Sequence, residues 1–505
     1  MTAMNDDKTR AKRGFIFITT AKIYFLLTSL FAQLAFPRLF GDTVLFGQYR
    51  VVSAILNVFS MVTITATVQA VSKFASQKSL SDKGVIKGAC LVQAGVFLPI
   101  FLVLFFGSGI IATYVFHDDA LAPPIMASAF VLLAYAFYAV FVGVINGTKR
   151  FERQAGLDIT FSTLKTLIMA VLVVLTSSVT FAFSGFAVAA IIVMFLSMLL
   201  ARPYTEGEFL KPSQYLSYLL PIGLWAFLLN LLLQADVIAL KAKRFDGGPD
   251  EASVVAGIFG AAKNLATLPY QAVISLSFVA FPFVASASSE QRAKDAGSNA
   301  IRVAAVLTVF TVVFIYPIRE KLLSAIFGSP YEKAGPYMLA LLCASSLLAL
   351  MHVANALIAS ASRPFWVLWS GSAAVTTQVA LLYSLIGFIT TNASKMAAYA
   401  TLSGCAVGAF LSLLIASRLF GRKFLKTLFS TFFGGGVSVL LSRALEDIVH
   451  PIEMSFISIT IFVLVLFFTK GVTIDEAKFL LASTRKHRRQ QDSEHFSDKA
   501  PKVEQ

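Results

Sequence analysis

The feature that most constrains this chain is a series of long apolar runs, separated only by short polar breaks. A helix needs roughly 20 mainly apolar residues to cross the hydrocarbon core of a bilayer, and about 14 runs meet that need. Of the 505 residues, 57% are hydrophobic and only 14% are charged, whereas a soluble chain carries about 25% charged residues. The sequence therefore predicts an all-α polytopic membrane protein with about 14 transmembrane helices.

The predicted helices form two sets of six and a final pair. The first set covers 14–36, 50–71, 88–114, 121–146, 158–178 and 181–201. The second covers 214–240, 254–286, 298–325, 335–361, 364–390 and 396–419, and the pair covers 427–445 and 452–469. We expect a cytoplasmic N-terminus (1–13), an N-lobe (14–201), a cytoplasmic linker (202–213), a C-lobe (214–420), the final helix pair (421–470) and a basic, disordered cytoplasmic tail (471–505).

The basic residues predict the orientation. Of the 42 Lys and Arg, about 29 fall on the side shared by both termini, about 10 on the other side and about 3 within helices. Because positively charged loops stay inside, both termini are expected in the cytoplasm of a bacterial cell, with the protein spanning its inner membrane. The net charge of +15 belongs mostly to these loops, so no nucleic-acid partner is expected.

An internal repeat accompanies the two sets of six helices. A shift of 210 residues places Gly47 on Gly257, and a shift of 211 places Phe116 on Phe327. The order of helix ends and loops is kept across both copies. Duplicated halves are common in transporters, so the repeat predicts two six-helix lobes with two helices appended.

Polar side chains interrupt several of the apolar helices. An ionisable residue within the membrane usually faces a cavity or a partner rather than lipid. In 254–286, Lys263, Asn264 and Gln271 share one face, and Lys263 lies roughly 13 Å from the helix start. Pro269, within the same predicted helix, is expected to loosen the backbone.

Helices 1 and 2 carry similar polar faces, which we expect to line a central cavity. Arg50 and Asn57 lie on the second helix, and Lys22 and Gln33 on the first. Substrate-binding candidates are thus Lys263, Arg50, Lys22, Asn57, Asn264, Gln271 and Gln33, with Asp236 as a candidate for ion coupling and Lys165 and Lys73 as secondary candidates.

For some of these residues a purely structural role is an alternative. Lys22 can snorkel to the interface, Lys165 can satisfy a neighbouring helix, and Asp236 can pair with Lys241 or face the aqueous rim. If the cations do line a cavity, its positive charge suits an anionic headgroup, because Lys and Arg hold phosphate oxygens by charge-assisted hydrogen bonds. An exporter of organic cations would need the opposite lining.

The chain resembles the polysaccharide-type (Wzx-like) flippases of the multidrug/oligosaccharidyl-lipid/polysaccharide (MOP) exporter superfamily. The resemblance rests on Phe46-Gly47-Gln48-Tyr49 and on the stretch from Asp236 to Lys263, which contains Gly-Ile-Phe-Gly-Ala-Ala-Lys-Asn-Leu. It implies alternating access between two lobes and transport of an undecaprenyl-pyrophosphate-linked oligosaccharide, driven by a gradient of H⁺ or Na⁺. It also implies membrane lipids, a polysaccharide polymerase and a chain-length regulator as candidate partners, and no other cofactor.

Three alternatives remain open. A lipid II flippase of the same superfamily fits the helix number, although its denser set of arginines is absent from the first two helices. A membrane glycan polymerase or ligase usually works in a large outer loop, whereas the outer loops here are short and the five His do not cluster. A multidrug or cation exporter is disfavoured, because the predicted cavity is positively charged. No catalytic or metal motif is recognisable, so we expect a transporter and not an enzyme.

Overall fold

A computed structural model describes residues 2–77, 79–201, 208–271, 273–274, 289–361, 364–386, 392–469 and 471. These residues are helical almost throughout, and their only β-pairing is one isolated bridge between Leu80 and Glu208. The all-α class expected from the sequence is confirmed.

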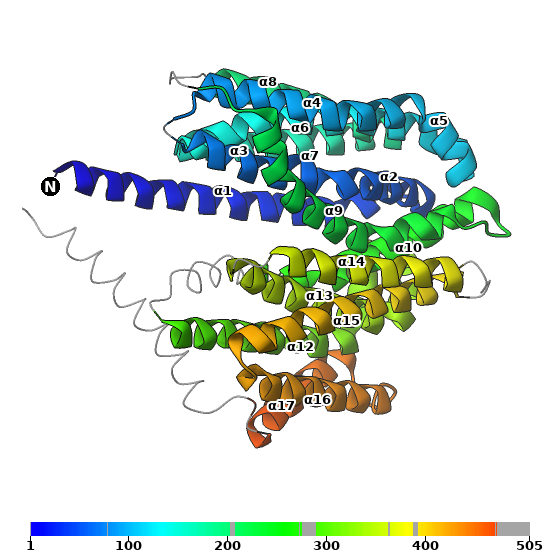
Figure 1. Ribbon diagram of the computed structural model, residues 1–505. Helices are drawn as coiled ribbons and strands as arrows, with labels where there is room; N and C mark the ends of the chain where they lie inside the picture. Colours follow the sequence, from blue (N-terminus) through cyan, green and yellow to red (C-terminus); the bar gives the residue numbers. More distant parts are fainter. Residues whose placement is uncertain are drawn as a thin grey trace, which may run out of the picture.

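The N-terminal half packs as one group of helices, drawn in blue to cyan in Figure 1. Its elements are α1 (Thr2–Phe40), α2 (Thr43–Met61), η1 (Val62–Ala66), α3 (Thr67–Ala75), α4 (Asp82–Phe106), α5 (Ser108–Ile110), η2 (Ile111–Val115), η3 (Asp119–Leu121), α6 (Ala122–Gly147), α7 (Phe151–Thr176) and α8 (Val179–Leu200).

The C-terminal half lies beside it, with α16 and α17 outermost (Figure 1). Its elements are α9 (Pro212–Ala242), α10 (Gly248–Ala266), α12 (Glu290–Phe327), η4 (Ser329–Ala334), α13 (Gly335–Ser360), α14 (Pro364–Leu381), η5 (Leu382–Ile386), α15 (Ala393–Phe420), α16 (Lys423–Ala444) and α17 (Pro451–Phe468).

Thirteen helical stretches within the described residues are long and apolar enough to cross a membrane, close to the expected 14. The predicted span 254–286 begins as α10, and most of its second half lies outside the described residues. By itself α10 is too polar to qualify, because it contains Asp250, Glu251 and Lys263. The predicted tail also lies outside the described residues, apart from Gly471.

Two helix boundaries differ from the sequence-based expectation for clear physical reasons. The first helix runs from Thr2 to Phe40 and so extends beyond the predicted membrane span 14–36 at both ends, since a helix need not stop where an apolar run stops. The last full turn of α10 ends at Ala266, and Thr267 forms a turn two residues before Pro269. This is the loosening expected of a proline, which removes one backbone hydrogen bond.

Helix α9 connects the two halves. Its first turns pack in the N-terminal half, where the buried Tyr215 hydroxyl accepts a 2.9 Å hydrogen bond from Gln93 of α4. Further along, Trp225 of α9 lies against Gly371 of α14 in the C-terminal half. Figure 1 shows α9 running obliquely from one group of helices toward the other, so α9 is part of both packing units.

Candidate functional site

The two halves touch closely where α2 meets α10. A Cβ atom on Gly47 would lie 1.8 Å from the carbonyl oxygen of Ser253, and one on Gly257 would lie 3.0 Å from the Cα of Gly47. Only glycine permits this approach. Gly47 and Gly257 are also the two residues that the internal repeat places on one another, so the halves meet at corresponding positions.

A buried ion pair lies at the predicted outer end of this contact. The ammonium of Lys241, in the last turn of α9, lies 2.6 Å from Oδ2 of Asp118 in the N-terminal half. It also donates to Ser253 Oγ at 2.6 Å and to the Pro249 carbonyl at 2.7 Å. Gln48 of α2 donates to Asp118 at 3.4 Å. We call the side chains of Gln48, Asp118, Lys241 and Ser253 the outer clasp.

Further contacts join the halves at the same end. Arg244 donates to the His117 ring at 3.1 Å, and Arg38 of α1 donates to the carbonyl of Ala325 on α12. The rings of Phe46 and Tyr331 meet edge to face with centroids 6.1 Å apart. The predicted outer face is therefore closed by polar and aromatic contacts in this conformation.

A second buried ion pair lies deeper, within the C-terminal half. Lys263 of α10 donates a short hydrogen bond to Oδ2 of Asp236 on α9, and both side chains are buried. The hydroxyl of Thr401 on α15 donates to the same oxygen at 2.8 Å, and the amide of Gln378 on α14 donates to Thr401 at 3.0 Å. The Asp236 carboxylate is thus held by donors from two other helices, α10 and α15, and Gln378 of α14 contacts it only through Thr401.

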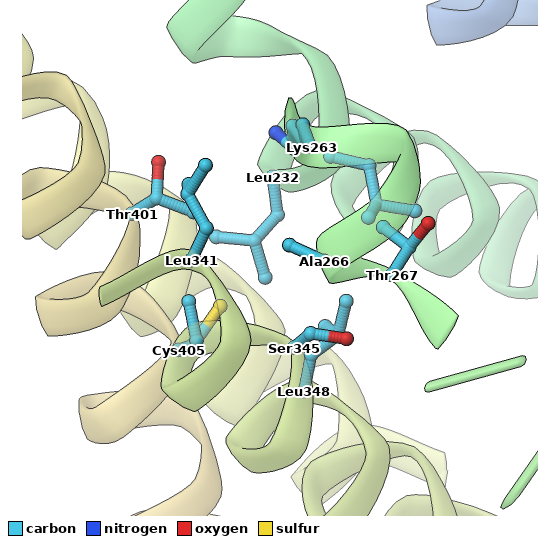
Figure 2. A pocket seen from close by; sticks show the side chains of 11 residues that line it. Leu232, Lys263, Ala266, Thr267, Leu341, Ser345, Leu348, Thr401 and Cys405 are labelled. Atoms are coloured by element: carbon cyan, nitrogen blue, oxygen red, sulfur yellow. The ribbon is translucent and has the colours of Figure 1, made fainter. Parts of the chain in front are cut away.

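A small pocket lies directly beside Lys263, between α9, α10, α13 and α15. Figure 2 shows Lys263, Thr267, Ser345 and Thr401 around it, among mostly apolar side chains. Its volume is about 20 Å³, enough for roughly one water molecule. A water or small cation reaching this pocket would therefore be next to the Asp236–Lys263 pair.

Among the described buried Lys and Arg side chains, Arg50 of α2 is the one without an ion-pair partner. Its Nε atom is buried and has no hydrogen-bond partner among the described residues. The side chain lies against Gly260 of α10, where a Cβ atom would come within 2.5 Å of Nε. Asp236 attracts its charge, but no described carboxylate forms an ion pair with it. The guanidinium therefore lies at the boundary of the halves with hydrogen-bonding capacity to spare.

The other predicted residues lie apart from this centre or contribute less. Lys22 is exposed on α1, which agrees with its snorkelling alternative. Lys165 is partly buried among the rings of Phe25, Phe161 and Phe186, with centroids 5.4 to 6.0 Å from its ammonium. Lys73 is exposed at the end of α3. The neutral candidates, all partly buried, are Gln33, Asn57, Asn264 and Gln271.

Two interpretations of the sequence need revision. Asp236 neither pairs with Lys241 nor faces an aqueous rim: it is fully buried and paired with Lys263, whereas Lys241 pairs with Asp118. Lys263 is therefore not a free cavity cation, because Asp236 offsets its charge in this conformation. The sequence analysis did not identify Asp118 or Thr401. Lys241 at a predicted helix end and Asp118 in a predicted outer turn could have indicated their ion pair.

The described residues contain no group of three or more His, Cys, Asp and Glu side chains arranged to hold a metal ion. Between them, the two ion pairs and Arg50 join helices from both halves. This arrangement can bind an anion at Arg50, respond to a cation at Asp236 and change when the halves separate at the outer clasp.

Comparison with known proteins places these features in context. A family described as polysaccharide biosynthesis protein matches residues 44–336, more than half of the chain. No curated protein matches the chain significantly in sequence.

Solved structures share the fold. The lipid II flippase MurJ in an inward closed conformation has a TM-score of 0.69 and 14% identity, covering 90% of this chain and 98% of that one. An inward-facing multidrug resistance MATE transporter of the MOP superfamily has a TM-score of 0.55 and 13% identity, covering 80% and 94%. A MOP transporter from Pyrococcus furiosus, with a binding pocket of reversed polarity, has a TM-score of 0.51 and 13% identity, covering 82% and 95%.

Proposed function

This chain belongs to the polysaccharide biosynthesis protein family, and from that premise we propose that it is a flippase for a lipid-linked oligosaccharide. It carries an undecaprenyl-pyrophosphate-linked repeat unit from the cytoplasmic to the outer leaflet of the bacterial inner membrane. Both termini lie in the cytoplasm, and a polymerase and a chain-length regulator act on the product. The fold shared with MOP transporters supports alternating access between the two halves.

Arg50 is the observation that carries this proposal. It is buried between the halves, and its Nε has no hydrogen-bond partner among the described residues. A buried, unpaired guanidinium costs free energy unless a ligand compensates it. A pyrophosphate offers several charged oxygens, and the planar guanidinium of Arg can contact two of them at a time. The headgroup of the substrate therefore binds at Arg50, with its lipid tail in the bilayer.

The outer clasp supports the direction of access. Its Lys241–Asp118 pair joins the halves at the predicted outer end, so this conformation keeps the site closed to the outside. Release of the headgroup outward requires these contacts to break. The substrate consequently enters from the cytoplasmic side before the clasp opens.

The Asp236–Lys263 pair is our candidate for ion coupling. A proton or Na⁺ on Asp236 would remove the charge that holds Lys263, and Lys263 would then be available to the anionic headgroup beside Arg50. Entry of the cation and binding of the anion are thereby linked through one carboxylate. Gln378 and Thr401, which donate along one path toward Asp236, orient the carboxylate for this exchange.

The test is the sidedness of lipid-linked glycans in cells depleted of the protein. A membrane-impermeant glycosidase acts on spheroplasts, and undecaprenyl-pyrophosphate glycans are analysed by mass. We expect one repeat unit to accumulate in a protected, cytoplasmic form. Accumulation of accessible, unpolymerised units would point instead to a polymerase, and unchanged lipid-linked glycans would rule out the proposed substrate.

Lipid II is the second candidate substrate. The fold likeness to the lipid II flippase extends over 90% of this chain and 98% of that one. Its substrate presents the same pyrophosphate to Arg50, so the site itself does not distinguish the two. The same depletion experiment does, because the accumulated species would then be the peptidoglycan precursor.

A further inference from the structure

A polar groove on the predicted cytoplasmic face lies outside the site described above. It is formed by α3, the turn between α6 and α7, and the early part of α9. Its volume is about 520 Å³, within the range of about 300–1,000 Å³ that is usual for small-ligand pockets. The groove therefore has room for a lipid headgroup.

The charge of the groove is wholly positive. Lys73 and Lys149 line it, together with Gln69, Ser72 and Asn146, and no Asp or Glu is among its lining residues. Two ammonium groups with nearby hydroxyl and amide groups provide the donors that a phosphate needs. An anionic ligand would be attracted by both ammonium groups, whereas a cationic ligand would be repelled by them.

Both lysines are positioned by the fold. The ammonium of Lys73 lies 3.6 Å from the centroid of the Tyr218 ring on α9. Lys149 has a left-handed backbone with φ of 60°, and its N–H donates to the Asn146 carbonyl at 2.9 Å. This backbone conformation is uncommon outside glycine, and it places Lys149 in the turn that borders the groove.

We propose that this groove binds the phosphate of a lipid headgroup in the cytoplasmic leaflet. The placement in that leaflet rests on the orientation given in the proposed function, whereas the phosphate chemistry rests on the groove alone. The phosphate belongs either to an anionic phospholipid or to the lipid-linked substrate before it enters the central site. Through Tyr218 the headgroup touches α9, the helix that is shared by both halves.

The experiment measures lipid retention by native mass spectrometry of the purified full-length protein. Phosphatidylglycerol, undecaprenyl pyrophosphate and phosphatidylcholine are added in separate samples. The test variant is Lys73→Gln/Lys149→Gln. The matched control is Lys87→Gln, because Lys87 is also exposed near the start of α4 and lies 5.5 Å from a ring centroid, that of Phe209, but does not line the groove.

We expect the double variant to retain anionic lipid about tenfold less than the wild type, since each lysine contributes to headgroup binding, and Lys87→Gln to match the wild type. Loss of phosphatidylglycerol alone assigns the groove to phospholipid, and loss of undecaprenyl pyrophosphate alone assigns it to the substrate. Equal retention by the double variant and the control, or equal loss of phosphatidylcholine, overturns the proposal. Because the readout is binding in detergent, it stands apart from the glycan sidedness that tests the function.

Discussion

The ammonium of Lys241 has no exposed surface and lies 2.6 Å from the carboxylate of Asp118, on the opposite half of the molecule. Burying two charges costs several kcal/mol per ion, and their attraction offsets this only while they remain paired. When the halves part at this end, water reaches both groups and hydrates them. The pair is consequently strong in the closed, dry state and is replaced by hydration in the open one, which suits a contact that has to break in each transport cycle.

The first prediction concerns this pair. Asp118→Asn removes the ion-pair partner of the buried Lys241, so we expect the outer face to open more often. A cysteine at the buried position Ala252, in a background without the three native cysteines, should react at least about tenfold faster with an impermeant maleimide. The swap Asp118→Lys/Lys241→Asp should slow the reaction again. Equal labelling rates in all variants would show that the pair does not hold the outer face closed.

The second prediction concerns Asp236 and Lys263. Either Asp236→Asn or Lys263→Met leaves one buried charge unpaired, at a cost of about 3–5 kcal/mol. The double variant removes both charges and should be more stable than either single variant. Thermal unfolding in detergent measures this coupling. Additive losses of stability would mean that the two side chains do not act as a pair.

The third prediction concerns Arg50. Because its guanidinium is proposed to bind the headgroup, Arg50→Ala should lower glycan export at least about tenfold, and Arg50→Lys should keep more activity by retaining the charge. Protein level and membrane insertion should stay close to the wild type. Arg443→Ala, at an exposed position on α16, is the control. Normal export in Arg50→Ala would remove Arg50 from the substrate path.

The fourth prediction concerns the contact of α2 with α10. The methyl group of Gly47→Ala would fall 1.8 Å from the Ser253 carbonyl oxygen, so the helices must separate. We expect a strong loss of folded protein, measured by fluorescence-detected size exclusion in detergent. Gly95→Ala is the control, because no atom lies within 4 Å of its added Cβ, and alanine favours a helix. Similar loss in both variants would indicate a general intolerance of side chains at helical glycines.

The helices were predictable from sequence because each is a long apolar run, and the apolar requirement of the bilayer acts on every run separately. The partners of the charged residues were not predictable from the sequence. Asp236 was predicted as a candidate for ion coupling near a helix end, but its partner Lys263 lies 27 residues away and Thr401 lies 165 residues away. The packing of separate helices decides which of several cations pairs with a carboxylate. The pattern of polar residues along a single helix does not contain that information.

The meeting of Gly47 with Gly257 gives the two halves the arrangement of a symmetric dimer. Two helices that touch at corresponding residues lie as they would across a two-fold axis, where a residue meets its own copy. Around this contact the halves differ, because one carries Arg50 and the other carries Lys263 and Asp236. A larger side chain at either glycine would push the opposite helix away, so the contact restricts both halves at once.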